Sequence, residues 1–372
     1  MKKNFLKLIL TFSFILSALS SNAFVVDGIT YSVSNSTTKT VNVAQGNYSG
    51  VINVPEKVTY DGVEYTVTGV SMNAFNSSGA TSISLPPTVT SLGMMCFQFS
   101  AYLESITLSD NITSIPVMAF DGCSMLKSIT IPAAATSMGI AALQNCTLLE
   151  EVIFPENSAM TTLNMSVFNN CAALTNLTLP NSITTIESNC FQRCSSLKNI
   201  KLPENLKTIN SNLFLSCSAL ETISFPASVT SIGETVFGGC YGMKKVILPA
   251  GVQTIGKECF ADCTSLNEIY YGAELPIMAA PNIFSETTYE SATLFITEEA
   301  KSQVAETLPW SKFLNVEVFD FAGVADITSD EDFPIEIYNF NGMKMSNNIN
   351  LLSPGIYVKR QGSKTSKFRK TK

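Results

Sequence analysis

The residues with the most evident chemical potential in this chain are its ten cysteines. Cysteine recurs at intervals of 23, 25, 23, 23, 23 and 23 residues, and Cys96, Cys190 and Cys259 lie four residues before the same phase of the repeat. Pairs such as Cys190 and Cys194 could hold a metal ion or form a redox centre, but a metal site needs further ligands, and other repeats place Ala, Val or Leu at the earlier position. We therefore predict free, buried thiols that pack as small hydrophobic groups. The recurring residues are Cys123, Cys146, Cys171, Cys194, Cys217, Cys240 and Cys263.

Disulfide bonds are the alternative use of these cysteines. In a stack of repeats, equivalent residues of neighbouring copies have Cα atoms about 4.8 Å apart, which is within the range for a disulfide. Their Cβ vectors would run parallel instead of converging, so each bond would need a local twist. The spacing therefore favours free thiols.

Acid–base and nucleophilic catalysis find little support in the residue types. The chain has no histidine, which excludes Ser–His–Asp and Cys–His arrangements. A Ser or Thr recurs nine residues before each cysteine, as at Ser231 and Thr254, without an accompanying base, and cross-strand hydroxyl pairs explain such a column. A retaining glycosidase would need two carboxylates about 5–5.5 Å apart, whereas no neighbouring repeats place two acids in either of the two columns that follow the cysteine by four and five residues. We therefore predict a non-enzymatic protein with no catalytic, cofactor-binding or metal-binding residues.

The charged columns are the candidate ligand face. Opposite charges meet on neighbouring repeats in Glu104–Lys127–Glu150, Lys198–Glu221–Lys244 and Lys245–Glu268. On an exposed sheet each such pair stabilises by roughly a few tenths of a kcal/mol. Large aromatic anchors are scarce on this face, which predicts weak, multivalent contacts with a protein or matrix ligand. The candidate residues are Glu104, Lys127, Glu150, Glu151, Lys198, Lys201, Glu221, Lys244, Lys245, Glu268 and Tyr270.

The elements that must position these columns follow from the same repeat. Phe or Leu lies three residues before the cysteine, Leu or Met three after it, and apolar residues follow at six and eight, often with a proline next. This order predicts a short strand, a proline that ends it, a second short strand and one helical turn ending at F-x-x-C. One copy cannot bury its apolar side alone, but stacked copies share a continuous core. The predicted fold class is therefore an α/β solenoid of units of about 23 residues.

The pattern C-x-x-L-x-x-I-x-L-P-x-x-V-x-x-I-x-x-x-x-F-x-x-C, as in residues 194–217, resembles the BspA-like leucine-rich repeats of bacterial surface proteins. The resemblance covers residues 70–271 as the solenoid. It implies a β-rich N-terminal cap at residues 24–69 and a strand-helix C-terminal cap at residues 272–319. It also implies that the extended face of the solenoid contacts host extracellular matrix or another microbe.

Both ends of the chain carry expected targeting segments. Residues 1–23 open with Lys2 and Lys3, followed by a mostly apolar stretch and small residues at the end, as in a secretory signal peptide; a buried N-terminal helix is the alternative. Residues 320–333 form an acidic linker. Residues 334–372 form a small β module that resembles the final strands of the type IX secretion sorting domain, the alternative being a β module without that role.

Composition limits the remaining functions. With 23 basic and 30 acidic residues the net charge is −7, which argues against nucleic acid as a partner. Charged residues make up only 14% of the chain, so its surface is polar rather than ionic. We expect a monomer without a transmembrane helix in the mature chain, secreted to the outer surface or periplasm of a Gram-negative bacterium. The alternatives are a structural cell-envelope component without a discrete ligand and a glycan-active enzyme.

Overall fold

A computed structural model describes residues 23–272, 278–319, 321, 336–338, 355–361 and 364–370. The chain divides into two compact units, which are described separately: unit 1 ends at Ala173 and unit 2 begins at Leu174. The predicted signal peptide and the predicted linker, apart from Ala23 and Phe321, lie outside the described residues.

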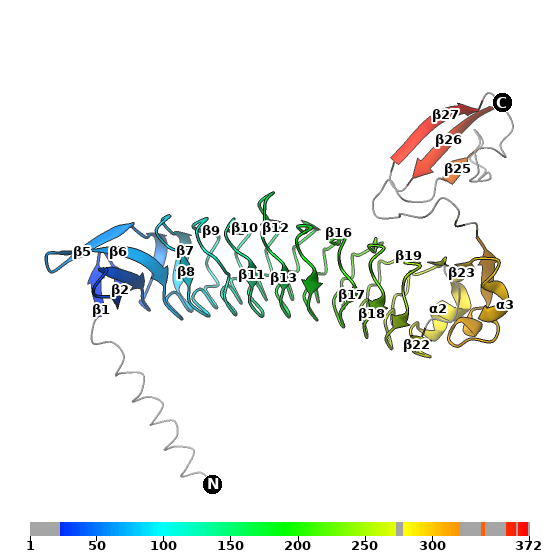
Figure 1. Cartoon of the computed structure of the whole chain (residues 1–372), viewed down its shortest axis with the longest axis horizontal. Coiled ribbons are helices and arrows are strands. Elements are labelled where there is room, and N and C mark those ends of the chain that lie inside the picture. Colours follow the sequence, from blue (N-terminus) through cyan, green and yellow to red (C-terminus); the bar gives the residue numbers. More distant parts are fainter. Residues whose placement is uncertain are drawn as a thin grey trace, which may run out of the picture. The chain divides into compact units, whose positions relative to one another are not determined.

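Unit 1 begins with an antiparallel cap that becomes parallel before the repeats start (Figure 1). The β1–β2 and β5–β6 hairpins turn at Asp27-Gly28 and Asp61-Gly62, all four with positive φ, because Asp and Gly tolerate the left-handed conformation of tight hairpins. The pairs β3–β6 and β6–β8 are parallel, so β6 joins the cap to the first repeat. The strands of this sheet are β1 (Ala23–Val26), β2 (Ile29–Asn35), β3 (Thr40–Val43), β5 (Lys57–Tyr60), β6 (Val63–Val70) and β8 (Ser91–Leu92).

Each further repeat of unit 1 forms one coil of a solenoid. The first strand of a coil pairs in parallel with that of the next coil, as in β4–β7, β7–β9 and β10–β12, and the second strands pair likewise in β11–β13. These strands are β4 (Ser49–Asn53), β7 (Gly79–Ser84), β9 (Ser105–Thr107), β10 (Ser128–Thr130), β11 (Ser137–Met138), β12 (Glu151–Ile153) and β13 (Thr162–Leu163).

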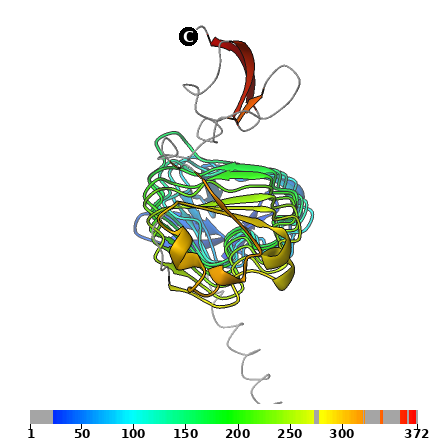
Figure 2. The same cartoon turned by 90° about the vertical axis from the view of Figure 1, so that its right-hand side faces the viewer.

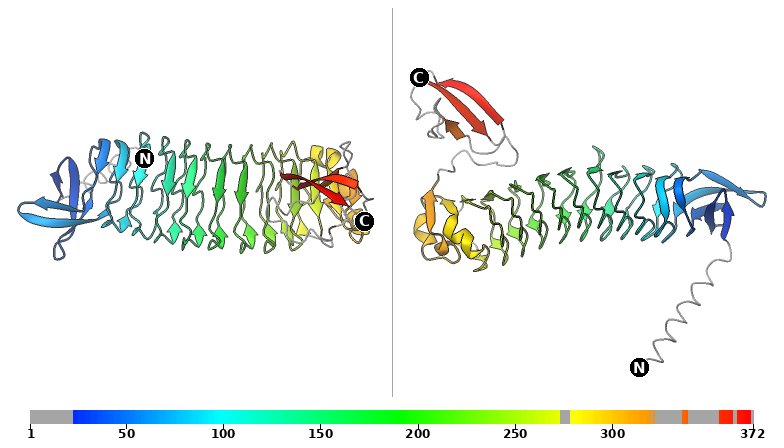
Figure 3. Two further views of the ribbon diagram at one scale, coloured as in Figure 1. Left: turned by 90° about the horizontal axis from the view of Figure 1, so that it is seen from above. Right: turned by 180° about the vertical axis from the view of Figure 1, so that it is seen from behind.

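Unit 2 repeats this arrangement (Figure 3). Parallel pairs join β14–β16, β17–β18–β20–β22 and β19–β21–β23–β24. Its strands are β14 (Asn176–Thr178), β15 (Thr185–Ile186), β16 (Asn199–Lys201), β17 (Thr208–Ile209), β18 (Ser231–Ile232), β19 (Lys245–Leu248), β20 (Thr254–Ile255), β21 (Glu268–Tyr271), β22 (Met278–Ala279), β23 (Thr293–Ile296) and β24 (Asn315–Val318).

Short helices cover the last coils of unit 2 (Figure 2), and buried aromatic side chains pack with them. The helices are α2 (Glu286–Ser291), α3 (Lys301–Val304) and the 3-10 turn η1 (Trp310–Lys312). The Trp310 side chain is fully buried, and its ring lies parallel to that of Tyr271 with centroids 5.6 Å apart. This packing closes the apolar end of the core.

Three antiparallel strands follow nearer the C-terminus. They are β25 (Glu336–Tyr338), β26 (Gly355–Gln361) and β27 (Lys364–Lys370), in the order β25-β26-β27. Three strands in one sheet agree with the β-rich character expected of residues 334–372, and they do not bear on a sorting role.

The core of each unit is a set of columns of similar side chains, of which the Phe column, interrupted by Leu143, is the clearest. In unit 1 the rings of Phe75, Phe97 and Phe120 stack with centroids 5.3 and 4.9 Å apart. In unit 2 the rings of Phe214 and Phe237 stack at 5.5 Å, and the column continues to Phe260 and Phe284. Each repeat thus buries its apolar side against the next one, as the repeat pattern predicted.

The predicted helical turn in each repeat is wrong, and the fold is a β-solenoid of leucine-rich repeats. Near Phe97 the backbone N–H groups alternate: Phe97 donates to Ala119 of the next coil at 2.9 Å, and Gln98 donates to Met95, three residues back, at 3.1 Å. The two residues Met95 and Phe99 have φ of 57° and 56°. Positive φ at two positions per coil interrupts α-helical bonding, so the segment forms successive β-turns that share hydrogen bonds with the neighbouring coil.

Candidate functional site

The charged columns lie beside the first strand of each coil, and backbone hydrogen bonds between coils fix their positions. In unit 1 the N–H of Glu150 donates to the carbonyl of Lys127 at 2.8 Å, and in unit 2 the N–H of Lys244 donates to the carbonyl of Glu221 at 3.0 Å. One side chain of this column is therefore presented per coil at the strand spacing, and it is charged in six of the eight coils, with Thr175 and Asn267 in the other two. The exposed members are Glu104, Lys127, Glu150 and Glu151 in unit 1, and Lys198, Lys201, Glu221 and Lys244 in unit 2.

Ion pairs form along this face in unit 2. Lys244 Nζ lies 2.8 Å from Glu221 Oε2, and Lys245 Nζ lies 3.7 Å from Glu268 Oε2. The hydrogen bond from Lys244, together with its charge and that of Lys198, lowers the pKa of Glu221. Lys201 pairs with Glu204 of its own coil at 3.6 Å. The predicted meeting of opposite charges is thus present at two coil-to-coil contacts of unit 2.

The four charged candidates of unit 1 behave differently. Among the residues that the structure describes in unit 1, the one ion pair within 4 Å joins Lys57 to Glu64 in the cap, so the predicted pairing of Lys127 with Glu104 and Glu150 is wrong. Their side chains face solvent singly. Unit 1 therefore offers separate charges where unit 2 offers a paired ladder.

Tyr270 was expected on the exposed face, and its side chain is in fact only 7% exposed. Its ring stacks on Phe295 at 4.4 Å between centroids, Lys245 Nζ lies 4.3 Å from the ring centroid, and its hydroxyl donates to Glu268 Oε2 at 3.1 Å. The cause is the following coil: β23 places Phe295 directly beside Tyr270 in register. Tyr270 therefore organises the Lys245–Glu268 pair and is not itself a contact surface.

All ten cysteines are free and buried, which confirms the prediction. The thiol of Cys123 donates to the carbonyl of Phe97 at 3.1 Å, and that of Cys217 donates to the carbonyl of Phe191 at 3.1 Å. Ser100 occupies the same position in an earlier coil and donates to Phe75 at 2.6 Å. Burial raises the pKa of the Cys217 thiol well above its ordinary value. Because the thiolate is the reactive form, these cysteines serve packing and hydrogen bonding.

The hydroxyl column also forms a ladder, in which Thr254 Oγ1 donates to Ser231 Oγ at 2.7 Å. Within the described ranges no group of three or more Cys, Asp or Glu side chains is placed to hold a metal ion. The side chains of the cysteine and hydroxyl columns therefore link neighbouring coils of the solenoid.

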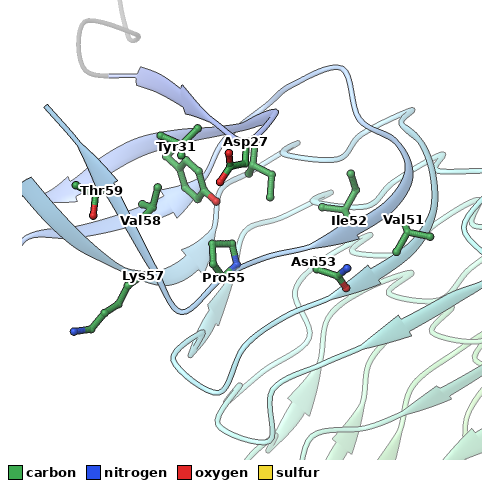
Figure 4. Close-up of a pocket in the computed structure, with 11 residues that line it drawn as sticks. Asp27, Tyr31, Val51, Ile52, Asn53, Pro55, Lys57, Val58 and Thr59 are labelled. Atoms are coloured by element: carbon green, nitrogen blue, oxygen red, sulfur yellow. The ribbon is translucent and has the colours of Figure 1, made fainter. Parts of the chain in front are cut away.

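A pocket that sequence reasoning missed lies in the cap of unit 1, with a volume of about 530 Å³ (Figure 4). Lys57 on its wall pairs with Glu64 at 2.7 Å. Burial, with the nearby Tyr48 and Asp27, raises the pKa of Tyr31 to about 12, so its hydroxyl stays protonated near neutral pH. Asp27 is the one carboxylate among the residues that line it, so a pair of acids is not assembled there. The lining residues are Val26, Asp27, Ile29, Tyr31, Val51, Ile52, Asn53, Pro55, Lys57, Val58 and Thr59.

A ladder of amide side chains in unit 1 was also missed. Asp121 is buried, and its carboxylate accepts hydrogen bonds from Gln98 at 2.9 Å and from Asn145 at 3.0 Å. The ladder continues from Gln98 to Asn76 and from Asn145 to Asn170. The recurrence of Asn, Gln or Asp one or two residues before the cysteine position was the available signal.

The family model described as the BspA type leucine rich repeat region, present in six copies, matches residues 62–173 and 161–290. This chain belongs to the BspA-type leucine-rich repeat family. The expected resemblance is thereby confirmed. The proteins of this family are typically repeat proteins of bacterial cell surfaces, and the family is not one of enzymes. The sorting-domain resemblance of residues 334–372 is not part of this match.

Solved structures of bacterial leucine-rich repeat proteins are similar to this BspA-type protein. One from Bacteroides ovatus shares 23% identity over 80% of this chain and 100% of its own, with a TM-score of 0.42. A leucine-rich cell surface protein from Faecalibacterium prausnitzii shares 20% identity over 81% and 96%, with a TM-score of 0.47. The pneumococcal vaccine antigen PcpA shares 20% over 80% and 99%, with a TM-score of 0.44. No curated protein matches the chain.

Among the described residues, no helix has the length and apolar character needed to cross a membrane. The helices of the C-terminal cap, α2 and α3, have six and four residues.

Proposed function

We propose that this BspA-type protein is a secreted, non-enzymatic protein of the bacterial surface that makes adhesive contacts through the charged face of its solenoid. The observation that carries the proposal is the repetition of exposed charged side chains at one position of the coil, in six of eight coils, held by backbone bonds such as those of Glu150 and Lys244. A rigid array of this kind suits many weak contacts with a repetitive ligand.

The scarcity of anchoring side chains supports weak, multivalent binding by a monomer. Trp310 and Tyr270 are buried, the exposed tyrosines Tyr60, Tyr102 and Tyr241 stand outside the charged column, and Arg193 is the one arginine in residues 23–272 and 278–319. Because Trp, Tyr and Arg dominate tight interfaces, we infer that avidity supplies most of the strength of the contact. The burial of the thiols, and the lack of a second carboxylate beside Asp27 in the lining of the cap pocket, support the absence of catalysis.

Binding is tested with the chain from residue 24 to residue 372, displayed in many copies on beads and offered to immobilised extracellular matrix proteins. We expect saturable binding that is lost in a variant carrying Lys198→Glu, Lys244→Glu and Lys245→Glu. The matched control, with the same change of charge away from this face, carries Lys207→Glu, Lys257→Glu and Lys301→Glu and should retain binding. Equal loss in both variants would show a net-charge effect, and silence across the panel would favour a structural envelope component.

Surface display is tested separately. Protease treatment of whole cells followed by mass spectrometry should release peptides from residues 24–319. Removal of residues 334–372 should abolish this release if that segment directs sorting; unchanged release would reject the sorting role and leave the adhesive proposal standing.

A further inference from the structure

An exposed apolar column runs along unit 1, six residues before the cysteine position of each coil. The exposed fractions are 52% for Met72, 47% for Met94, 44% for Ile140 and 42% for Met165. Val117 occupies the same position between Met94 and Ile140 and is half-buried. Five successive coils thus present one apolar side chain each, which we call the apolar stripe.

Close packing of the coil backbones fixes the spacing of this stripe. A Cβ added at Gly93 would lie 2.3 Å from the backbone nitrogen of Met72, and one added at Gly139 would lie 2.5 Å from that of Val117. Adjacent coils therefore touch at the position next to the stripe. The Phe rings of unit 1 give the repeat along the stack, 5.3 and 4.9 Å, so the five side chains span about 20 Å.

The surroundings of the stripe carry no charge. The five segments 68–74, 90–96, 113–119, 136–142 and 161–167 contain no Asp, Glu, Lys or Arg. The equivalent segments of unit 2 contain charged residues, namely Glu187, Lys207, Glu234, Lys257 and Glu258. Two of these, Glu234 and Lys257, stand at the position of the stripe itself and pair at 3.6 Å. The apolar stripe is thus a property of unit 1 and not of the repeat.

Polar groups border the stripe, as at the rim of a protein interface. On one side Ser91 and Ser114, three residues before the stripe, are exposed. On the other side the amide ladder begins, where Gln98 Nε2 donates to the sulfur of Met118 at 3.7 Å. Hydrogen-bonding groups therefore flank an apolar centre, and the carboxylate of this ladder, that of Asp121, is buried and bound by Gln98 and Asn145.

We propose that the apolar stripe binds one amphipathic α-helix of a partner protein, lying along the stack of coils. An α-helix rises about 5.4 Å per turn, close to the coil spacing of 5.3 and 4.9 Å, so apolar residues at i, i+3/i+4, i+7, i+11 and i+14 meet the five coils, one each. A span of about 20 Å corresponds to roughly 14 helical residues. Methionine suits such a groove because its flexible, polarisable side chain adapts to different apolar partners.

Two other occupants fit less well. A second copy of this chain would need about 800 Å² from each partner for a stable interface, whereas the stripe is one or two side chains wide. A membrane surface recruits proteins through lysine and arginine near the apolar residues, and the five segments contain neither. The absence of charge thus favours a helix whose contacting face is itself uncharged.

The test uses the chain of residues 24–372 and a fluorescein-labelled peptide of about 18 residues with leucine at helical spacing and neutral polar flanks. Fluorescence anisotropy should show saturable binding, and a scrambled peptide of the same composition should not bind. A variant with Met94→Gln and Ile140→Gln should bind the peptide at least about tenfold more weakly. Met94→Leu should retain binding, since it keeps the side chain apolar.

The matched control makes the same change at the same column of unit 2, with Ser188→Gln and Ser211→Gln, and should leave peptide binding unchanged. The charge-reversed variant Lys198→Glu, Lys244→Glu, Lys245→Glu should also bind normally, which separates this surface from the adhesive face. Circular dichroism melting confirms that the variants fold.

Several results would overturn the proposal. They are absence of peptide binding to the wild-type chain, equal binding of the scrambled peptide, and unchanged binding by the Met94→Gln, Ile140→Gln variant. Stripe-dependent binding to neutral phosphatidylcholine vesicles in place of the peptide would assign the stripe to a membrane. Stripe-dependent dimerisation in sedimentation velocity would assign it to a second copy.

Discussion

Units 1 and 2 are built on the same core columns and differ in what they present outside. Both stack phenylalanine rings, at 4.9 Å for Phe97–Phe120 and 5.5 Å for Phe214–Phe237. Six residues before the cysteine, however, unit 1 exposes Met94 and its equivalents, whereas unit 2 pairs Glu234 with Lys257. The core of a repeat protein constrains one set of positions strongly and leaves the others free, so one framework can carry two different surfaces.

The largest expected effect tests whether the two cores are equivalent. Phe120→Ala in unit 1 and Phe214→Ala in unit 2 should each lower the free energy of unfolding by about 3–5 kcal/mol, because both side chains are fully buried. Phe99→Ala should change it by less than about 1 kcal/mol, since that ring is 53% exposed. Urea denaturation followed by circular dichroism measures all three. A small loss of unfolding free energy for one of Phe120→Ala and Phe214→Ala, with a large loss for the other, would mean that the two cores differ.

Alkaline pH should destabilise both ends of the structure. Burial raises the pKa of Tyr31 in unit 1 and of Tyr271 in unit 2 to about 12, from 10.0. Because the pKa of each tyrosine is higher in the folded chain than in the unfolded one, the neutral buried hydroxyl contributes fully to the stability of the fold below pH 10. This contribution is lost as the pH rises towards 12. Absorbance of the tyrosinate at 295 nm should lag behind that of a free tyrosine. Tyr31→Phe and Tyr271→Phe should each remove part of the delayed titration.

The cysteine column allows a direct exchange between units. Ser100 and Cys217 donate to a phenylalanine carbonyl of the preceding coil, at 2.6 and 3.1 Å. Ser100→Ala and Cys217→Ala should each cost about 1 kcal/mol of unfolding free energy, because the donor is lost. Ser100→Cys should cost less, since it keeps a donor. Equal costs for Ser100→Cys and Ser100→Ala, measured by denaturation, would show that the hydrogen bond contributes nothing.

The smallest effect concerns the exposed charges. Lys244→Gln in unit 2 should lower stability by no more than a few tenths of a kcal/mol, because the Lys244–Glu221 pair is exposed and screened by salt. Lys127→Gln in unit 1, where no ion pair is lost, should change nothing measurable.

The pH dependence of this pair has a defined sign. The pKa of Glu221 is lowered in the folded chain, so its contribution is present above the unfolded pKa and disappears as the pH falls through the folded one. The difference between wild type and Lys244→Gln should therefore vanish in acid and in high salt. A difference that persists at acid pH would mean that Lys244 acts by packing and not by charge.

Much of the fold could be predicted from the sequence, because repetition converts one local pattern into a whole core. The phases of Phe, Leu, Ile and Cys gave the core columns, and the structure buries Phe214, Cys217 and Leu220 accordingly. The F-x-x-C spacing suggested a helix, since both a helical turn and a chain of β-turns bring residues three apart to one side. Asn, Ser and Gly at the two positive-φ positions, such as Asn189 and Gly239, were the available sign of β-turns.

The candidate site was less predictable, because exposure depends on neighbours in other coils. Lys244 and Glu221 were placed together by their common phase, which the sequence contains. The burial of Tyr270 was not foreseeable from its own repeat, since it is covered by Phe295, which belongs to the divergent cap. The cap pocket and the amide ladder were also not foreseeable from the sequence, because both depend on contacts between side chains of several strands or coils.

The sequence by itself determined the repeat, the family and the identity of the core columns, because side chains at one phase must fall on one another when copies stack. Tertiary structure alone decided the backbone path between the strands, the hydrogen bonds of the thiols and which surface residues remain exposed. The physical reason is that hydrophobic periodicity specifies burial in one dimension, whereas exposure and hydrogen bonding depend on atoms brought close by neighbouring coils.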